Sequence, residues 1–281
     1  MSAGLEAVVA GLAAAPKYRD LAPETLERMA RWALVRHERP ADALKAAKRK
    51  LHQAFGAYLD PTAVPAAHRV MDRLSPRPAP EEIAAAARRI LALHRSAAER
   101  LPVLVEYYAA ITEAVGPPAC VLDIAAGLNP FALPFMGLPV ATRYVAVEVD
   151  RGLVGAAERF LALAERPGEA VWADVLVRLP EAGADLALVL KSLPCLEQQE
   201  PGAGQALLRR LEAVPRIVVS WPVRSLGGRD KGMVATYTAE AEALAEAAGR
   251  PMTRLAIESE LVFLLGPATA IPDTGRRPVP K

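Results

Sequence analysis

Polar side chains follow four apolar runs in the second half of this 281-residue sequence. Asp123 ends the first run, Glu148 follows the second, Asp174 the third and Lys191 the fourth. Each acid alone is more often a helix cap than a ligand. Ligands of open parallel sheets bind outside the carboxyl ends of the strands, however, and there these four positions meet. Together they predict a cofactor site in which Glu148, or its rival Asp150, accepts the ribose hydroxyls of a nucleoside.

The segment after the first run reads Asp-Ile-Ala-Ala-Gly-Leu-Asn-Pro over residues 123–130. Gly127 would let the backbone approach a ligand closely, and Asp123 could receive a cationic or amide group. Ala125 stands where a glycine-rich loop usually has glycine. By itself the segment therefore predicts no more than a turn.

Other reaction classes lack the residues that they need. The sequence has no HExxH, GxSxG or phosphate-binding loop motif, and its histidines all lie in the N-terminal part, at His37, His52, His68 and His94. Cys120 and Cys195 form no CxxC pair and lie in apolar runs, where buried free thiols are common. We therefore expect no catalytic histidine, no metal site and a cytoplasmic location.

The spacing of apolar residues predicts the elements that position this chemistry. After Gly116, short β-branched runs alternate with helical segments, which is typical of βαβ units in a parallel sheet. Five parallel strands followed by an antiparallel hairpin indicate an α/β fold, the Rossmann-like sheet of S-adenosylmethionine (SAM) dependent methyltransferases. The expected strands are residues 119–124, 144–147, 170–173, 186–190, 216–220, 252–257 and 261–265.

The N-terminal part shows helical spacing and no strand-like alternation. Prolines divide it into several short helices, a longer helix over 81–100 and another over 102–115. We expect an all-helical domain over 1–105. A methyltransferase domain would follow over 106–268, and a disordered tail over 269–281.

Composition supports a globular chain and excludes collagen-like and disordered classes. Its 25 prolines and 18 glycines fall short of low-complexity levels, and no apolar run is long enough to span a membrane. The formal net charge is only +2, but ten basic residues face five acids between Lys17 and Lys50. That local excess is a weak indication of an anionic partner.

Several motifs together resemble one enzyme family, the aminoglycoside-resistance 16S rRNA (guanine-N7)-methyltransferases, which modify guanine 1405 in helix 44. The 123–130 segment is similar to the cofactor loop of that family. The most specific match is residues 220–233, Ser-Trp-Pro-Val-Arg-Ser-Leu-Gly-Gly-Arg-Asp-Lys-Gly-Met. Departures are small, since Ala126 replaces a frequent cysteine, Glu148 the usual aspartate and Trp221 a common phenylalanine. Further matches lie at 17–19, 50–53, 94–102, 190–191 and 197–199.

The resemblance implies a SAM pocket to which both domains contribute. Arg100 would pair with the methionine carboxylate, Glu148 would bind the ribose, and Asp174 would contact the adenine together with its neighbour. The complete implied set is Phe55, His94, Arg95, Ser96, Arg100, Ala125, Gly127, Glu148, Asp174, Val175, Leu190 and Gln199.

The resemblance also implies that the 30S ribosomal subunit is the partner, and that the helical domain over 1–105 binds rRNA and this subunit. Arg229 would hold the distorted RNA backbone around the target base, and Met233 would lie beside that base. Other RNA contacts would come from Lys17, Arg19, Lys45, Lys48, Arg49, Lys50, Arg224 and Lys231. No general base is expected, because guanine N7 carries no proton near neutral pH.

Two other functions remain compatible with these residues. A SAM-dependent methyltransferase of a small metabolite would use the helical domain as a lid over its substrate. A non-catalytic 30S-binding factor would keep a degenerate SAM fold, which only Ala125 and Ala126 favour. In each case we expect a monomer that uses neither a metal nor a membrane.

Overall fold

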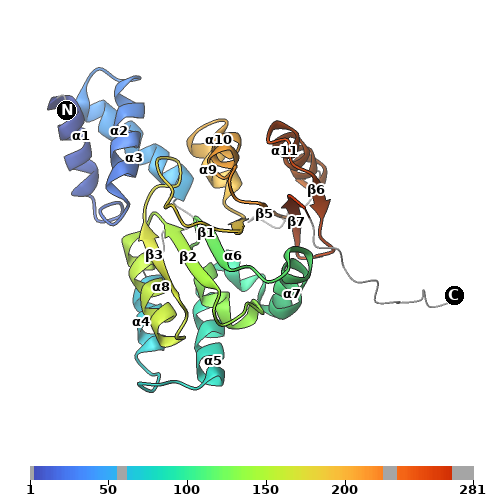
Figure 1. Ribbon diagram of the computed structural model, residues 1–281. Helices are drawn as coiled ribbons and strands as arrows, with labels where there is room; N and C mark the ends of the chain where they lie inside the picture. The colour runs from blue at the N-terminus through green and yellow to red at the C-terminus, as the bar shows by residue number, and fades with distance from the viewer. Residues whose placement is uncertain (1–2, 56–61, 224–232, 268–281) are drawn as a thin grey trace.

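A seven-stranded sheet with the strand order β3-β2-β1-β4-β5-β7-β6 forms the centre of the molecule (Figure 1). The computed structural model describes residues 3–55, 62–223 and 233–267. Strands β1 to β5 pair in parallel, and β7 pairs antiparallel with both β5 and β6. The strands are β1 Cys120–Ile124, β2 Arg143–Glu148, β3 Gly168–Trp172, β4 Leu186–Leu190, β5 Arg216–Pro222, β6 Met252–Arg254 and β7 Glu260–Leu265.

The predicted α/β sheet and its terminal hairpin are therefore confirmed. Most strand bounds agree within two residues, but β6 ends at Arg254 rather than at Ile257. The amide of Leu255 still donates to the carbonyl of Val262, although regular pairing has stopped. The expected tail over 269–281 lies outside the described residues.

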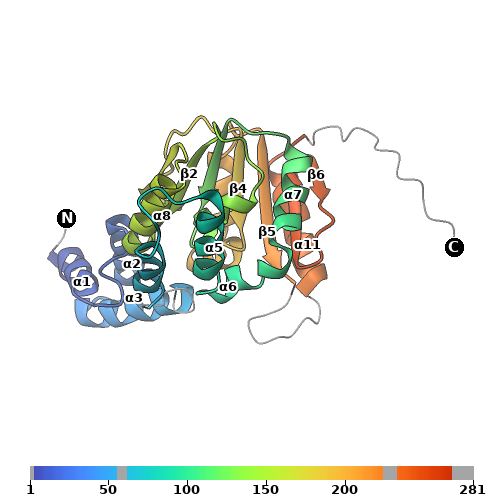
Figure 2. The ribbon, with the colours of Figure 1, turned by 90° about the horizontal axis from the view of Figure 1, so that it is seen from below.

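Alternating side chains of the strands pack into two cores, one on each face of the sheet. In β2, Tyr144 and Ala146 belong to the first core, whereas Val145 and Val147 belong to the second. The first core is covered by α4 Ala63–Met71, α5 Pro80–Leu91, α7 Leu104–Val115 and α8 Arg151–Leu163. The second is covered by α9 Leu193–Gln199, α10 Ala203–Arg210 and α11 Met233–Ala247. Figure 2 shows α5, α7 and α8 in front of the strands.

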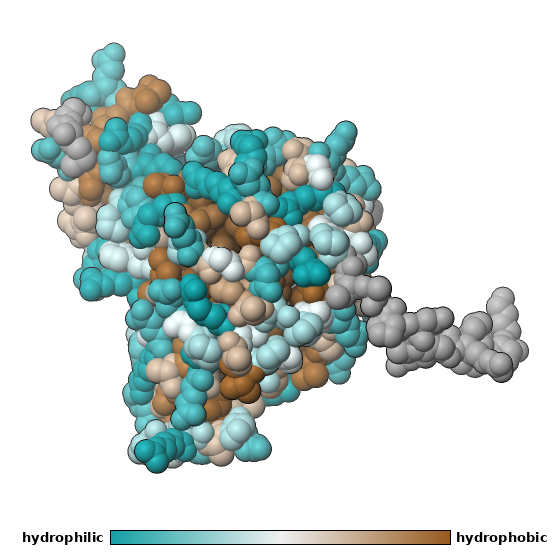
Figure 3. All heavy atoms as spheres, in the orientation of Figure 1, coloured by the Kyte–Doolittle hydropathy of each residue, from teal (hydrophilic) through white to brown (hydrophobic). Residues whose placement is uncertain are grey.

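The first three helices pack around a separate core. They are α1 Ala3–Ala13, α2 Pro23–Leu34 and α3 Pro40–Phe55, and we call them the α1–α3 lobe. The lobe is the projection at the upper left of Figure 3. The later N-terminal helices instead share the first core with the sheet, so the cores do not divide at residue 105. The expected domain boundary remains a prediction.

The single helix expected over 81–100 is wrong. Helix α5 ends at Leu91, a short helix α6 covers Arg95–Ala98, and a 3-10 turn, η1 Leu101–Val103, precedes α7. The break occurs because His94 adopts an extended conformation (φ −130°) and caps α6, its side chain accepting from the amide of Ser96. Helical spacing alone could not reveal a capping histidine. None of the described helices is long and apolar enough to cross a membrane.

We predict that Gly168→Ala destabilises the fold by about 3 kcal/mol, measured by urea unfolding. Gly168 has a φ of +151°, and a Cβ there would lie 2.0 Å from the carbonyl oxygen of Tyr144. Gly155→Ala, within α8 and with nothing within 4 Å of the added Cβ, is the matched control. It should instead stabilise by roughly 0.5–1 kcal/mol, since alanine is the better helix former. Equal unfolding midpoints for the two variants would contradict this account.

Candidate cofactor site

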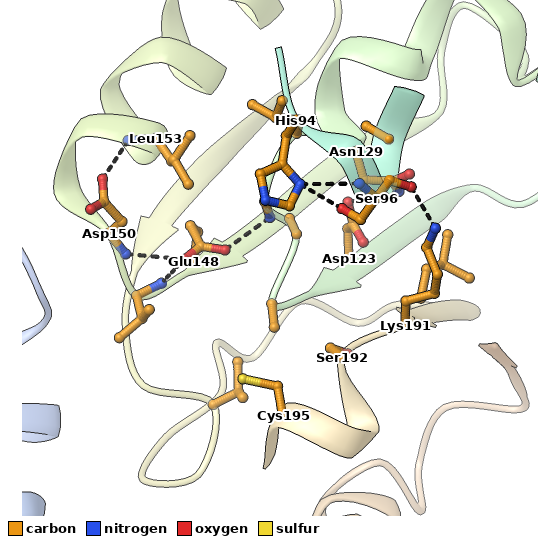
Figure 4. Close-up of a pocket in the computed structure, with 18 of the residues that line it drawn as sticks. His94, Ser96, Asp123, Asn129, Glu148, Asp150, Leu153, Lys191, Ser192 and Cys195 are labelled. Atoms are coloured by element: carbon orange, nitrogen blue, oxygen red, sulfur yellow. Dashed lines mark hydrogen bonds between the residues drawn. The ribbon is translucent and has the colours of Figure 1, made fainter. Parts of the chain in front are cut away.

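A pocket lies at the carboxyl ends of β1 to β4, bordered by residues of α3, α5, α6 and α9. Between β1 and β4 the strand order reverses, and crevices at such reversals are the usual ligand sites of doubly wound sheets. The structure brings nearly all the sequence-predicted cofactor residues to this pocket, and Figure 4 shows His94, Ser96 and Glu148 among them. Those that line it are Phe55, His94, Ser96, Arg100, Ala125, Gly127, Glu148, Asp174, Val175, Leu190 and Gln199.

Arg95 is the exception among the predicted cofactor residues. Its side chain is 56% exposed, and its Nε donates to Glu99 at 3.2 Å along α6. The preceding helix break explains the difference, because His94 and Ser96 face the pocket while the residue between them faces outward.

The loop after β1 bends sharply at two residues. Ala125 has a φ of +51° and Gly127 a φ of +53°, so both adopt the left-handed conformation. This conformation costs a residue with a Cβ roughly 1–2 kcal/mol, which explains why glycine is usual at the first of these positions. The 123–130 segment is therefore a strained turn that presents its backbone to the pocket.

The Glu148 carboxylate joins the loops after β1 and β2. One oxygen accepts from the Gly127 amide at 2.8 Å, and the other accepts from the amides of Val149 and Asp150 at 2.7 and 3.1 Å. Burial raises the pKa of Glu148, although these three amides oppose the rise. Because each carboxylate oxygen can accept more than one hydrogen bond, Glu148 can still accept hydroxyls from a ligand. Its rival Asp150 also lines the pocket, and it caps α8 by accepting from Leu153 at 2.9 Å.

Asp123 is held by neutral donors at the base of the pocket. Its Oδ2 accepts from the Tyr144 hydroxyl at 2.5 Å and from the Asn129 amide at 3.0 Å. The Tyr108 hydroxyl in turn donates to the Asn129 carbonyl. Burial raises the pKa of Asp123 to about 7 despite these hydrogen bonds.

Two cations surround one carboxylate on the other side of the pocket. Arg100 makes a two-pronged contact with Glu260, at 2.6 Å from Nε and 2.8 Å from Nη2, and Lys191 Nζ lies 3.0 Å from the same carboxylate. Burial alone would lower the pKa of Arg100, but Glu260 together with Tyr107 and Tyr108 outweighs burial and raises that pKa. The two cations similarly overcome burial and hold the pKa of Glu260 below its usual value. Lys191 also lies 3.4 Å from the carboxylate of Glu99, so the two cations are balanced by two carboxylates. The Nη1 of Arg100, however, meets the neutral Asn129 side chain at 3.4 Å and can donate to an anionic group such as an amino-acid carboxylate.

Lys191 also fixes the break between α5 and α6. Its Nζ donates to the Ser96 carbonyl oxygen, while the Nδ1 of His94 lies 2.7 Å from the Ser96 hydroxyl (Figure 4). Lys191 itself has a φ of +57°, which its backbone amide stabilises by donating to Ser220. The ends of β4 and β5 thus position the helical side of the pocket.

Asp174 and Gln199 are held by α2 of the α1–α3 lobe. Thr25 donates to Asp174 at 2.9 Å, and Arg28 donates to the same oxygen through Nε at 3.0 Å and Nη2 at 2.8 Å. The Nη2 of Arg28 also donates to the Gln199 carbonyl at 2.6 Å. Sequence reasoning missed Arg28, because its partners are 146 and 171 residues away and no local pattern marks them.

Glu260 is the second functional residue that the sequence did not indicate. The predicted strands 252–257 and 261–265 leave Glu260 in the turn between them. In the structure it begins β7, is buried, and binds Arg100, which lies 160 residues away in the sequence. One signal could have found it, namely an acid directly before the apolar run Leu-Val-Phe-Leu-Leu. A charge at the margin of a fully buried strand requires a partner.

The chemistry of the pocket fits an adenosyl amino acid. Along the sheet order, Asp174, Glu148, the Gly127 loop and the cation pair follow one another, which matches base, sugar and amino-acid ends. The Ser192 hydroxyl, which lines the pocket after β4, is buried and has no hydrogen-bond partner among the residues that the structure describes. Buried hydroxyls are normally hydrogen-bonded, so this one is suited to bind a ligand. Cys195 also lines the pocket, but burial raises the pKa of its thiol to about 12, so it is no nucleophile.

The predicted RNA-binding residues within the described ranges gather mainly on the α1–α3 lobe. Lys17, Arg19, Lys45 and Arg49 are exposed, whereas Lys48 and Lys50 are half-buried. The Nζ of Lys50 donates to the Gln198 carbonyl at 2.6 Å, so its charge is partly engaged. Met233 begins α11, half-buried and outside the pocket wall. The other predicted RNA contacts, Arg224, Arg229 and Lys231, lie outside the described residues.

Comparison with protein families and with curated proteins gives one consistent result. A family model described as "Ribosomal RNA methyltransferase (FmrO)" matches residues 14–264. A 16S rRNA (guanine(1405)-N(7))-methyltransferase of Frankia casuarinae is 42% identical over 254 residues, which cover 89% of each chain. An enzyme of the same name from Micromonospora echinospora is 39% identical over 89% of this chain and 92% of its own.

Solved structures with the same overall fold include 16S rRNA methyltransferases. RmtF in complex with S-adenosyl-L-homocysteine superposes with a TM-score of 0.79 at 33% identity, covering 95% of this chain and 99% of RmtF. The 16S rRNA methylase RmtB gives a TM-score of 0.75 at 29% identity, covering 94% and 98% of the two chains.

We predict that Asp123 makes the protein less stable as the pH rises from about 4 to about 7. Its pKa is raised from 3.8 to about 7 on folding, so across this interval the folded state keeps a proton that the unfolded state has lost. The free energy of unfolding of the natural protein should therefore fall, relative to that of Asp123→Asn, by at most about 1.4 kcal/mol per pH unit. Urea unfolding of both proteins at several pH values tests this, and parallel profiles would refute it.

Proposed function

The chain belongs to the FmrO family of ribosomal RNA methyltransferases, and we propose that it methylates N7 of guanine 1405 in the 16S rRNA of the 30S subunit. It is a SAM-dependent enzyme, as the family and the S-adenosyl-L-homocysteine complex of RmtF indicate. The observation that carries the proposal is the pocket itself. It combines cations, a ribose-binding carboxylate and an adenine-side acid in the order that this cofactor requires.

Each wall of the pocket has a defined task in this proposal. When bound, SAM supplies an electrophilic methyl group on a sulfonium sulfur. Arg100, fixed by Glu260, binds the amino-acid carboxylate, and Glu148 accepts the ribose hydroxyls. Asp174 contacts the adenine edge, and Leu190 borders the side from which the target base enters.

The proposed chemistry needs alignment rather than proton transfer. Guanine N7 has a free lone pair near neutral pH, so no side chain has to remove a proton before the attack. His94 fits this view, because it caps α6 and binds Ser96 instead of acting as a base. The contribution of the protein is to hold acceptor and donor in line, which can be equivalent to effective concentrations on the order of 10⁵ M or more.

The α1–α3 lobe is the proposed docking surface for the 30S subunit. Its exposed cations can bind RNA phosphates, which are recognised through shape and charge rather than sequence. The product would carry a methyl group and a positive charge at N7. Both would oppose binding of a cationic 4,6-disubstituted deoxystreptamine, so the proposed modification confers resistance to those aminoglycosides.

The central prediction is transfer of labelled methyl from SAM to unmodified 30S subunits, located by primer extension or mass mapping. We expect label at N7 of guanine 1405. In Arg229→Ala the label should be lost while SAM affinity stays unchanged, since this residue is proposed to hold the RNA backbone. Transfer to small metabolites but not to 30S subunits would support a small-metabolite enzyme. Binding to 30S subunits without SAM binding would support a non-catalytic factor.

A second prediction concerns the lobe surface. Lys45→Ala and Arg49→Ala should each weaken 30S binding and lower the salt slope of that affinity by about one, because each removes a phosphate contact. Their SAM affinities should not change. Arg209→Ala, which removes an exposed cation of α10 outside the lobe, is the matched control. An equal loss of 30S binding in the control would contradict docking through the lobe.

A further inference from the structure

The α1–α3 lobe meets the rest of the molecule at the rim of the cofactor pocket. The Ala22 amide donates to the Val149 carbonyl at 2.8 Å, and the Arg151 amide donates to the Asp20 carbonyl at 2.8 Å. The thiol of Cys195 donates to the Ala54 carbonyl at 3.0 Å. Val149 and Cys195 line the pocket and also pack against the core of the lobe. Docking of the lobe and assembly of the pocket wall therefore involve the same residues.

Arg28 is the central side chain of this contact. It is 16% exposed, and its guanidinium lies against two pocket residues that come from different elements. It binds Asp174, which follows β3, and Gln199, which ends α9. Thr25, one helical turn earlier on α2, adds a third donor to the same Asp174 oxygen. Arg28 is not itself part of the pocket wall, so it acts through these two residues.

The hydrogen bonds determine which atoms of Asp174 a ligand can use. Its Oδ2 is occupied by Thr25 and by both contacts from Arg28. Its Oδ1 accepts from the amide of Leu176 at 2.9 Å and retains acceptor capacity. The guanidinium also orients the Gln199 amide, because its carbonyl faces Arg28. Without Arg28, the carboxylate would keep Thr25 and the Leu176 amide but lose both guanidinium contacts, and the Gln199 carbonyl would lose its charged donor.

We propose that Arg28 is a positioning residue of the cofactor site, and that through it docking of the α1–α3 lobe and cofactor binding strengthen one another. The inference rests on the proposed function, because it assumes that Asp174 and Gln199 contact the cofactor. Coupling is reciprocal, so a cofactor that stabilises these two residues must also stabilise the docked lobe. The exposed cations proposed to bind RNA then lie on a surface whose position depends on cofactor occupancy.

The test compares two ligands by isothermal titration, S-adenosyl-L-homocysteine and 5′-methylthioadenosine, which lacks the amino-acid carboxylate. In Arg28→Met we expect both affinities to fall about tenfold or more, because both ligands carry the adenine. Glu260→Gln, at the cationic wall, should weaken the first ligand more than the second. Arg31→Met, exposed on the same helix and paired with Glu27, should change neither. Thermal melts must show each variant folded at the temperature of titration.

A double-variant cycle tests whether Arg28 acts through Asp174. If Arg28 acts through Asp174, then Arg28→Met combined with Asp174→Asn should weaken S-adenosyl-L-homocysteine little more than either change alone. A folded Arg28→Met protein with natural affinity for both ligands would overturn the inference. Failure of the natural protein to bind S-adenosyl-L-homocysteine would instead refute the proposed function.

The coupling has its own readout in 30S binding. For the natural protein, saturating S-adenosyl-L-homocysteine should tighten binding to 30S subunits about threefold or more. In Arg28→Met, 30S binding measured with and without that ligand should be the same. If the ligand does not change the affinity of the natural protein for 30S subunits, the proposed coupling is wrong.

Discussion

The arrangement of the site depends on one buried carboxylate that accepts backbone amides. Glu148 binds the amide of Gly127 after β1 and the amides of Val149 and Asp150 after β2, so it fixes two loops to each other. The second loop then provides the carbonyl of Val149 to the lobe and the side chain of Asp150 to α8. Buried amides must be paired, and here a single side chain satisfies three of them. The Gly127 loop, the proposed ribose site and the docking of the lobe therefore all depend on Glu148.

Opposite charges are brought to the pocket from segments far apart in the chain. Glu260 holds Arg100 and Lys191 on one side, and Arg28 holds Asp174 on the other. A buried pair is weak evidence for stability, because desolvation offsets the attraction, but removing one partner leaves a costly unpaired charge. The value of these pairs lies in orientation, since each presents a charged group to the ligand at a fixed place.

The sequence predicted the elements that local pattern controls. β-Branched runs located the strands, and the polar residues after them, such as Glu148 and Asp174, proved to share one pocket. It could not predict Arg28 or Glu260, because each acts through partners well over a hundred residues away. The break at His94 was missed for a different reason. Helical spacing continues through it, whereas the cap of His94 on α6 and the contact of Lys191 with Ser96 depend on the folded structure.

The docking of the α1–α3 lobe also bears on how enzymes of this architecture can diverge. The lobe forms hydrogen bonds to Val149 and Asp174, so it cannot be exchanged independently of the sheet. Recombination that joined a foreign N-terminal lobe to this sheet would leave Asp174 without Arg28 and Thr25, and the cofactor wall would be incomplete. A change of RNA target by exchange of lobes would therefore have to carry matching residues at the ends of β2 and β3. Gradual substitution of the exposed cations on the lobe is the easier route.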